Sequence, residues 1–512
     1  MVSCTLKQSV FTAGLAAGSL LYAAAEKPNI VVILADDFGY GEVQGLNPQH
    51  GKIKTPHLDK AIAEGMTFTD GHSSSAVCTP TRYGLMTGRY SWRTRLQHNV
   101  LKTGGKSIVS EDTLTLADLA KSQGYKTALI GKWHLGMLFN GSTKDSVNDI
   151  KEGTKITEGP IDKGGFDLYQ GFHNSRHMQM WLENDKAVRK LKREDLLPEL
   201  TKRTVSYIGD RAKAKEPFFL YVAWNSPHGP VVPSAEWQGK SGINPHADYC
   251  MQTDDSYGQV MQALKDNGIW DNTLVIYSSD NGTCPYASGL SELTKAGHKP
   301  SGELRGYKAD IYEGGHRVPF IATWPKVIKA GTKTDKIVCL TDILATMADI
   351  FDYDLKPDEG VDSYSLLPLF EGKEVQVRPD VINHSVHGYF AIRDQKWKLS
   401  VVNGSGGFSN PEIDRAKAKS AQKLSDVYQL YDMSKDPGEQ TNLADNYPEV
   451  VKRLRNLLDK QIAEGRSTPG TPQANDADAE ILVEKWNGAP RPDENKRKKS
   501  KKSKKSKKNK KK

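Results

Sequence analysis

The chain has 512 residues, of which 37% are hydrophobic and 26% charged, and its formal net charge is +9. This balance is typical of a globular protein of two or three domains, and it excludes fibrous and wholly disordered chains. The five cysteines are far apart in sequence: Cys4, Cys78, Cys250, Cys284 and Cys339. Because no Cys-x-x-Cys pair occurs, a disulfide scaffold and a zinc finger are both disfavoured, and any disulfide pairing stays open.

The first 25 residues have the pattern of a cleaved export signal. Lys7 stands in a short basic segment, residues 10–22 are an apolar run, and residues 23–25 offer an Ala-x-Ala cleavage site. The apolar run is too short to span a membrane comfortably. We therefore expect a secreted or periplasmic protein without a transmembrane segment, whose mature chain starts near Glu26.

Four short apolar runs predict the framework of the fold. They are NIVVILA (29–35), KTALI (126–130), FFLYVAW (218–224) and TLVIYSS (273–279). Apolar and β-branched runs of this length are typical of buried strands. Helical patterns lie between them, at 55–66, 113–124 and 254–268. This alternation predicts an α/β fold with a large, doubly wound, mixed but mostly parallel sheet flanked by helices.

Polar residues follow each of these runs and form a candidate site. They are Asp36 and Asp37, Lys132 and His134, His228, and Asp280 and Asn281. In doubly wound sheets, ligands bind at the carboxyl ends of the strands. Because four runs each deliver polar side chains to that edge, one shared site is favoured over four unrelated surface turns.

The sequence changes character after about residue 375. Residues 389–402 and 426–444 predict short antiparallel strands, and residues 447–465 predict a helix. We therefore expect the chain to divide into four regions. In chain order they are a signal peptide (1–25), a large α/β domain (26–375), a smaller α+β domain with an antiparallel sheet (376–465), and a flexible linker with a polybasic tail (466–512).

The last 17 residues carry most of the positive charge. Residues 496–512 hold 13 lysines or arginines and no acidic residue. Without them and without Lys7, the net charge is −5, so the folded body is mildly acidic. A segment of like charges with nothing apolar to bury is expected to be disordered. It either attracts polyanions weakly or serves only solubility, and we expect no specific nucleic-acid binding.

The residue types at the sheet edge suit an anionic ester held beside a metal ion. Four side chains offer carboxylate or amide oxygens: Asp36, Asp37, Asp280 and Asn281. Such hard donors favour Ca²⁺ or Mg²⁺ over Zn²⁺. Four further side chains are cationic: Arg82, Lys132, Lys308 and Arg317. Cations beside a metal suit a sulfate or phosphate ester, and His134 and His228 can move protons, although each residue taken alone could be an ordinary surface group.

A motif around Cys78 resembles the signature of a known family. The stretch CTPTRYGLMTGR (78–89) is similar to the Cys-x-Pro-x-Arg and Leu-x-Thr-Gly-Arg pattern of the type I sulfatases, the arylsulfatase-like branch of the alkaline phosphatase superfamily. Further blocks resemble this family in the right order, at 28–42, 124–136, 220–230, 275–282, 304–325, 397–399 and 430–444. The resemblance covers about residues 27–462. Thr81, where Ser or Ala is commoner, and His316, where an aliphatic residue is usual, depart from it.

The resemblance implies an exported sulfatase of alkaline phosphatase-like fold. Cys78 matches the cysteine that a maturation enzyme oxidises to formylglycine, whose hydrate carries two hydroxyl groups on one carbon. One hydroxyl attacks sulfur and the other then expels sulfate, whereas a plain serine or cysteine would need water for the second step. The resemblance also implies one Ca²⁺, whose ligands would be Asp36, Asp37, Cys78 as formylglycine, Asp280 and Asn281.

The remaining roles are also implied by the resemblance. Arg82 would stabilise the hydrated aldehyde, and Lys132 and Lys308 would bind sulfate oxygens. His134 would take the proton of the formylglycine hydroxyl, and His228 would protonate the leaving alcohol.

The expected substrate is a sulfated carbohydrate, because export and this family together favour polysaccharide degradation. Three histidines in loops at 98–105, 173–181 and 384–390 are candidates for contacts with sugar hydroxyls: His98, His177 and His387. Two alternatives stay open, a phosphomonoester or phosphonate hydrolase of the same superfamily and a non-catalytic protein that binds polyanionic glycans. The sugar, the position of its sulfate, and exo or endo action do not follow from the sequence.

Overall fold

The structure is a computed structural model that describes residues 27–101, 105–140, 150–175 and 177–479. The expected signal peptide (1–25) and the polybasic tail (496–512) lie outside the described residues. Within the described part of the chain, no helix combines the length and the apolar character that crossing a membrane requires.

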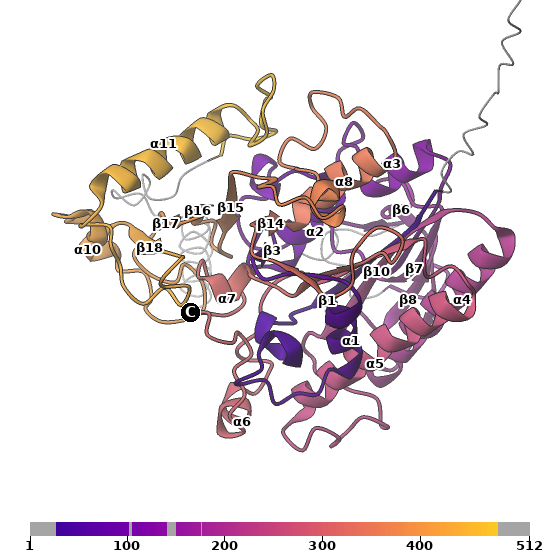
Figure 1. Ribbon diagram of the computed structural model, residues 1–512. Helices are drawn as coiled ribbons and strands as arrows, with labels where there is room; N and C mark the ends of the chain where they lie inside the picture. The colour runs from indigo at the N-terminus through magenta and orange to yellow at the C-terminus, as the bar shows by residue number, and fades with distance from the viewer. Residues whose placement is uncertain (1–26, 102–104, 141–149, 176, 480–512) are drawn as a thin grey trace, which may run out of the picture.

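A ten-stranded sheet forms the centre of the molecule (Figure 1). Its strands in spatial order are β13 (Thr332–Thr334), β2 (Met66–Phe68), β12 (Phe320–Thr323), β11 (Thr273–Ser279), β1 (Asn29–Asp36), β10 (Phe218–Pro227), β4 (Lys126–Lys132), β7 (Leu168–Phe172), β8 (Met180–Glu183) and β9 (Lys186–Lys190). The five strands from β11 to β7 are parallel to one another, whereas β12, β8 and β9 pair antiparallel with their neighbours. The predicted α/β fold with a mixed, mostly parallel sheet is therefore confirmed.

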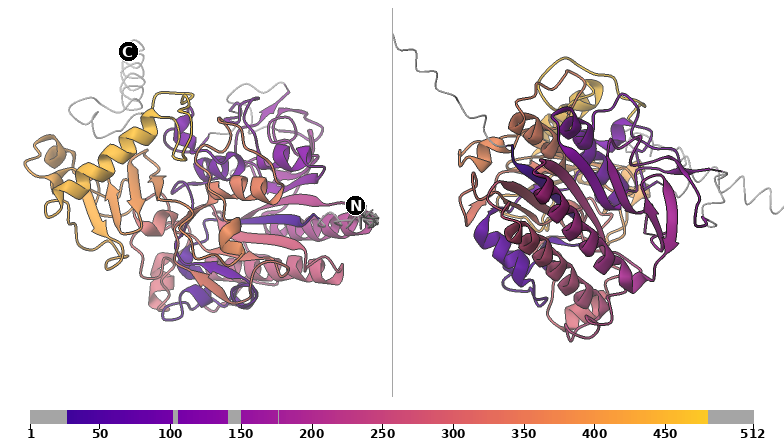
Figure 2. Two further views of the ribbon diagram at one scale, coloured as in Figure 1. Left: turned by 45° about the horizontal axis from the view of Figure 1, so that its top comes forward. Right: turned by 90° about the vertical axis from the view of Figure 1, so that its right-hand side faces the viewer.

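Helices cover both faces of this sheet (Figures 1 and 2). One layer holds α2 (Cys78–Thr87), α3 (Leu116–Ser122) and α8 (Ile343–Ile350), and the other holds α1 (Pro56–Glu64), α4 (Leu196–Ala214) and α5 (Pro245–Asp266). Strand β1 supplies both cores, because successive side chains of a strand point to opposite faces. Ile30, Val32 and Leu34 pack with the first layer, and the alternate residues from Val31 onward pack with the second.

The smaller elements complete the first domain. Short helices are α6 (Leu290–Lys295), α7 (Glu313–His316) and α9 (Leu367–Phe370). Two-stranded sheets pair β3 (Gly71–His72) with β14 (Val338–Cys339), and β5 (Leu138–Phe139) with β6 (Ile156–Glu158). Local chemistry sets the helix ends. The Thr115 hydroxyl accepts from the Asp118 amide (3.0 Å) at the start of α3, and Gly88 ends α2 in the left-handed conformation (φ 62°).

A four-stranded antiparallel sheet forms the smaller C-terminal unit. Its strands are β15 (Asp380–His384), β16 (Phe390–Asp394), β17 (Trp397–Ser400) and β18 (Gln429–Asp432), with α10 (Arg415–Lys419) and α11 (Pro448–Ala463) beside it. Leu454 and Leu458 of α11 share a core with this sheet and with Tyr90 and Trp92 of the first domain. The two units therefore share apolar contacts. Figure 2 shows the smaller unit beside the large sheet from a second side.

Residues 466–478 differ from the flexible linker that we expected to begin at residue 466. Arg466 is buried and donates to the Pro357 carbonyl (3.0 Å), and Asp476 pairs with Arg89 (2.9 Å). Arg93 donates to the Asn475 side chain (3.0 Å). Polar contacts to the first domain thus hold a segment whose sequence lacks the apolar residues that normally indicate packing.

The cysteines form no disulfide among the described residues. Cys78, Cys250, Cys284 and Cys339 are all buried as free thiols. Within this part of the chain, Cys78 therefore has no disulfide partner that would explain its place in a serine-rich loop.

Candidate active site

The four predicted strand ends meet at one edge of the sheet. Strands β11, β1, β10 and β4 are consecutive neighbours and run parallel, so their carboxyl ends lie side by side. Asp36 ends β1 and Asp37 follows it, while Lys132 ends β4 and His134 comes two residues later. Asp280 and Asn281 follow β11, and His228 follows β10. The edge that the sequence predicted as a shared site is thus a single cluster.

Three buried oxygens in this cluster have no hydrogen-bond partner among the described residues. They are Asp36 Oδ1, Asp37 Oδ2 and Asn281 Oδ1. Arg82 Nη2 lies 3.8 Å from Asp36 Oδ1, and His228 Nε2 lies 3.7 Å from Asp37 Oδ2, both beyond hydrogen-bond distance. Buried oxygens are normally satisfied, so three such oxygens together indicate a bound cation. Carboxylate and amide oxygens are the ligands that Ca²⁺ takes, so these residues fit the ion that the family resemblance implies.

Three cationic side chains surround the carboxylates. Lys132 Nζ lies 2.6 Å from Asp36 Oδ2, Arg82 Nη2 lies 2.8 Å from Asp280 Oδ2, and Lys308 Nζ bonds to Asp37 Oδ1. Arg317, the fourth predicted cation, instead pairs with Asp70 (2.6 Å) in a different cluster. Lys132 and Arg82 are fully buried and Lys308 is 7% exposed, so their charges act in a medium that screens them little.

These charges set the ionisation of the acids. Burial opposes ionisation of Asp36, but Lys132, His228 and Arg82 outweigh it and hold the pKa of that carboxyl well below its usual range. Burial and the charge of Asp36 instead raise the pKa of Asp280 to about 7. The three carboxyl groups are so close together that they cannot all ionise without further positive charge. A bound divalent cation would supply that charge.

Cys78 is the first residue of α2 and is 3% exposed. Burial raises the pKa of its thiol, although Lys132 and Lys308 oppose the effect. A protonated thiol is a poor nucleophile, so unmodified Cys78 is unsuited to attack an ester. Thr81, the departure from the family pattern, donates its hydroxyl to the Ser75 carbonyl (2.9 Å) and so fixes the loop that precedes Cys78.

The two histidines present different nitrogens for proton transfer. His134 Nε2 lies 3.3 Å from the Leu101 carbonyl oxygen. Because a carbonyl oxygen only accepts, Nε2 carries the proton in the neutral ring and Nδ1 is the acceptor. This buried Nδ1 has no hydrogen-bond partner among the described residues. His228 Nδ1 lies 2.5 Å from the Gly229 carbonyl, so Nε2 is the nitrogen that gains or loses a proton. Burial lowers the pKa of both rings, that of His134 well below its usual value.

Several backbones at the site are held in uncommon conformations. Asp37 (φ 66°), His134 (φ 55°) and Ala309 (φ 79°) are non-glycine residues in the left-handed region. Gly282, directly after Asn281, leaves no room for a side chain, since a Cβ there would lie 1.9 Å from the Gly314 carbonyl oxygen. Such strain persists only where surrounding structure imposes it, and it is typical of functional sites.

A pocket of about 520 Å³ opens onto this cluster. Its lining includes four of the predicted residues, Cys78, His134, His228 and Lys308. His98, His177 and His387 do not line it, although His98 and His387 adjoin the lining residues Asn99 and Val386 in sequence, and His177 Nδ1 lies 3.3 Å from Asn174 Oδ1. Their contact with a sugar stays a prediction.

Sequence reasoning missed the other lining residues, which include four aliphatic side chains and five polar or aromatic ones: Asn99, Asn174, Ser175, Tyr286 and Phe408. The first three lie in two of the loops that carry the candidate histidines. The sequence therefore indicated the correct loops, but the choice of histidine within them did not identify the lining residues. Tyr286 follows the polar end of β11 by a few residues, which is a usable signal. Phe408 comes from the C-terminal unit, and nothing in its local sequence indicates this position.

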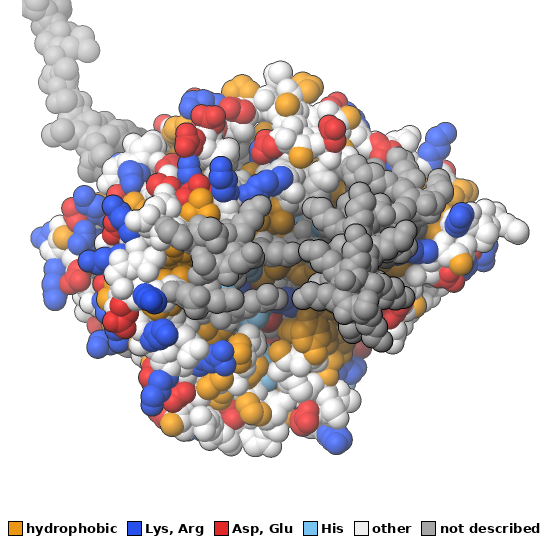
Figure 3. Space-filling model, turned by 180° about the vertical axis from the view of Figure 1, so that it is seen from behind, with side chains coloured by type: hydrophobic (Ala, Val, Ile, Leu, Met, Phe, Trp, Pro, Cys, Tyr) orange, Lys and Arg blue, Asp and Glu red, His pale blue; other side chains and the backbone are white. Residues whose placement is uncertain are grey.

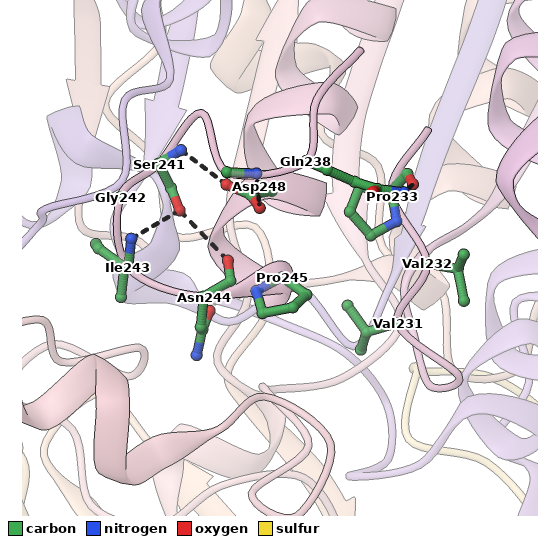
Figure 4. Close-up of a pocket in the computed structure, with 11 residues that line it drawn as sticks. Val231, Val232, Pro233, Gln238, Ser241, Gly242, Ile243, Asn244, Pro245 and Asp248 are labelled. Atoms are coloured by element: carbon green, nitrogen blue, oxygen red, sulfur yellow. Dashed lines mark hydrogen bonds between the residues drawn. The ribbon is translucent and has the colours of Figure 1, made fainter. Parts of the chain in front are cut away.

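A second pocket of about 390 Å³ lies beside the segment 231–248 (Figure 4). Its one carboxylate, Asp248, accepts from the backbone amides of Gly239 and Ser241 (both 2.7 Å). None of the predicted site residues lines this pocket. Asp248 therefore stabilises the loop, and the chemistry of the molecule lies at the sheet edge.

Comparison with known proteins identifies the family. The model of the sulfatase family matches residues 28–353. The chain belongs to the sulfatase family. It is 32% identical to an N-acetylgalactosamine-6-O-sulfatase of Bacteroides thetaiotaomicron, over 85% of this chain and 93% of that protein. It is also 32% identical to arylsulfatase A of Homo sapiens, over 85% of this chain and 88% of that protein.

Solved structures agree with this assignment. A 6S-sulfatase from a Bacteroides thetaiotaomicron locus for the metabolism of multiple glycosaminoglycans matches with a TM-score of 0.72 and 27% identity, over 85% of this chain and 99% of that one. The resemblance inferred from the sequence motifs is therefore confirmed, and this sulfatase is a sulfuric ester hydrolase of alkaline phosphatase-like fold.

Proposed function

We propose that this sulfatase is exported and hydrolyses sulfate esters of carbohydrates, with Cys78 matured to formylglycine and one Ca²⁺ at the sheet edge. The observation that carries the proposal is the set of three buried, unpartnered oxygens at the site, next to three cations and Cys78. A phosphate ester hydrolase or a glycan-binding protein could share the fold, but the family assignment and the filled site favour sulfate hydrolysis.

The proposed Ca²⁺ is held by oxygens of Asp36, Asp37, Asp280 and Asn281, together with the side chain at position 78. When bound, it neutralises the crowded acids and polarises the sulfate group. Mature formylglycine supplies, as its hydrate, one hydroxyl to attack sulfur and a second to release the sulfate. Both groups are implied by the family, and the residues present fit them.

Three cations have distinct tasks in this proposal. Arg82, fixed on Asp280, holds the oxygen at position 78 in place, because its guanidinium is buried and fully oriented. Lys132 and Lys308 neutralise the sulfate oxygens, and only Lys308 lines the pocket directly. Positive charge that is already in place lowers the barrier because no solvent has to reorganise during the reaction.

The histidines divide the proton transfers. The unpartnered Nδ1 of His134 accepts a proton from the hydroxyl at position 78, since its low pKa keeps the ring neutral. The Nε2 of His228 donates a proton to the departing sugar oxygen. Two rings whose pKa values differ can act as base and acid at one pH.

A secreted or periplasmic location and a maturation enzyme complete the proposal. They rest on the signal pattern at 1–25 and on the need to oxidise Cys78, and sulfated carbohydrates are the substrates of the bacterial relatives named above. The test is a panel of defined sulfated mono- and oligosaccharides with paired phosphate esters, on which released sulfate and phosphate are measured. Faster phosphate than sulfate release on matched esters would overturn the assignment.

A further inference from the structure

Two exposed aromatic rings stand at the mouth of the active-site pocket. Tyr286 is 71% exposed and Phe408 is 43% exposed, and their ring centroids lie 5.3 Å apart at 57°. Among the described residues, only Val375 and Tyr447 are other large hydrophobic side chains with comparable exposure. Exposed aromatic rings beside a pocket are typical of a ligand-binding surface. Figure 3 shows hydrophobic side chains gathered beside histidine atoms near the middle of one face.

Phe408 is held on the segment that carries Lys308. The amides of Phe408 and Ser409 both donate to Asp310 Oδ1, at 2.8 and 3.0 Å. Gly407 leaves no room for a side chain, because a Cβ there would lie 2.2 Å from the Ala309 carbonyl oxygen. The backbone that carries the Phe408 ring is thus fixed next to the segment of Lys308, two residues before Asp310, although it comes from the C-terminal unit.

Tyr286 is held on the segment that carries Asn281. The amides of Ala287 and Ser288 donate to the Cys284 carbonyl, at 3.2 and 3.1 Å, which closes a tight turn around Tyr286. The Lys308 amide donates to the Thr283 carbonyl (3.0 Å) and joins this turn to the Lys308 segment. The backbones that carry both rings are therefore fixed to the segments that carry the groups that would bind the sulfate.

The composition of the pocket favours a sugar over an apolar aglycone. A cavity of about 520 Å³ is larger than a sulfate group needs. Besides the catalytic candidates, its lining combines the two aromatic rings and four aliphatic side chains with the polar side chains of Asn99, Asn174 and Ser175. A pyranose ring has one apolar C–H face and a rim of hydroxyl groups, so it matches both kinds of surface. A wholly apolar group would match only the apolar part of this lining.

We propose that Tyr286 and Phe408 form an aromatic platform that binds the sugar ring next to the sulfated one. The substrate is then an oligosaccharide whose sulfated residue enters the pocket while its neighbour stacks on the platform. This inference rests on the proposed carbohydrate sulfatase function and extends it to the size of the substrate.

The test uses full-length, formylglycine-bearing enzyme and two matched substrates. These are the sulfated disaccharide that the unaltered enzyme hydrolyses fastest and the corresponding sulfated monosaccharide. Tyr286→Ala and Phe408→Ala should each raise KM for the disaccharide roughly 3- to 10-fold, the range expected for one aromatic contact. The KM for the monosaccharide and kcat for both should change less than about twofold, since the platform touches neither sulfate nor the reacting atoms.

Two control variants separate stacking from general damage. Tyr286→Phe keeps the ring and should retain the KM of the unaltered enzyme, and Val375→Ala removes an exposed apolar side chain that does not line the pocket. Equal losses on monosaccharide and disaccharide, or no loss on either, would overturn the platform while leaving the sulfatase intact. A loss confined to alkyl or steryl sulfates would assign the rings to an apolar aglycone instead. No sulfate release from any sugar by the unaltered enzyme would overturn the proposed function itself.

Discussion

Two of the buried charge clusters among the described residues differ in how their carboxylate oxygens are paired. At the junction of the two units, every carboxylate oxygen of Asp70, Glu313 and Glu439 has a charged or amide partner within about 3 Å, from Arg317, Arg393, Lys398, His72 or the Glu313 amide. At the sheet edge, Asp36 Oδ1 and Asp37 Oδ2 have no such partner among the described residues.

This difference separates structural charge from functional charge. In the junction cluster even Glu439 Oε1, which has no hydrogen-bond partner among the described residues, lies 2.8 Å from Lys398 Nζ, and none of the cluster's residues lines the pocket of the active site. The sheet-edge cluster is incomplete without a further cation, and a pocket opens onto it. Both clusters are buried and have perturbed pKa values, so burial and pKa shifts alone do not distinguish the structural cluster from the functional one. The unsatisfied oxygens and the open pocket do.

His316 belongs to the structural cluster. Its Nδ1 lies 3.0 Å from Nδ1 of His72, and its Nε2 lies 3.1 Å from the Ile311 carbonyl. The departure from the family pattern at this position is therefore explained by a buried contact between the histidines, away from the catalytic edge.

The largest expected effect is that of Asp37→Ala at the sheet edge. Removal of a ligand that the ion requires should abolish turnover, with a loss of at least about 10⁴-fold in kcat/KM. Bound calcium should fall below one ion per chain. Most of the fold should remain, but the thermal midpoint without calcium should also fall, because Lys308 loses its buried ion-pair partner. Stoichiometric zinc that restores activity after chelation would contradict the assignment of the metal.

The second largest effect concerns the leaving group. His228→Ala should lower kcat/KM on a sugar sulfate by about 10²- to 10⁴-fold, because a sugar alcohol must be protonated as it departs. Nitrophenyl sulfate, whose phenolate leaves without help, should be affected far less. Steady-state rates on both esters provide the comparison, and equal losses on the two would remove His228 from the role of acid.

The pH profile should show the same division of roles. Burial lowers the pKa of His228 below its ordinary value near 6.5, and a general acid acts only when protonated. Activity on a sugar sulfate should therefore fall about tenfold for each unit above about pH 6.5. His134 must be neutral, and its still lower pKa keeps it so across this range. A rate on sugar sulfate that rises from pH 7 to 9 would contradict this assignment.

A substitution in the junction cluster should lower the stability of the fold and leave the catalytic rate nearly unchanged. Glu313→Gln removes the carboxylate that Arg393, Arg317 and Lys398 share. Because Asp70 and Glu439 still pair with these cations, the fold should be destabilised by up to about 3–5 kcal/mol. The kcat of the folded enzyme at low temperature should stay within about twofold, because Glu313 does not line the pocket. Denaturant unfolding and steady-state kinetics on the same preparation test this. A large loss of kcat without loss of stability would make the junction part of the active site.

The sequence sufficed to predict the sheet edge because the same local pattern, an apolar run followed by polar residues, occurs at four strands. Each apolar run had to be a buried strand, and the polar residues after it had to lie at the carboxyl end. Lys308 and Arg82 are on no such strand end, so the family resemblance was needed to place them. Phe408 and the contacts of Arg466 depend on how distant segments pack, and polar or turn-rich sequence carries little signal for that.

The most direct test of the account is mass analysis of the peptide that contains residue 78, combined with rates. Conversion of cysteine to formylglycine makes the peptide about 18 Da lighter. In preparations made with different amounts of maturation enzyme, sulfate release from a sulfated sugar should rise in proportion to the converted fraction and vanish in Cys78→Ala. Full activity in a preparation that is entirely unmodified cysteine would contradict the account.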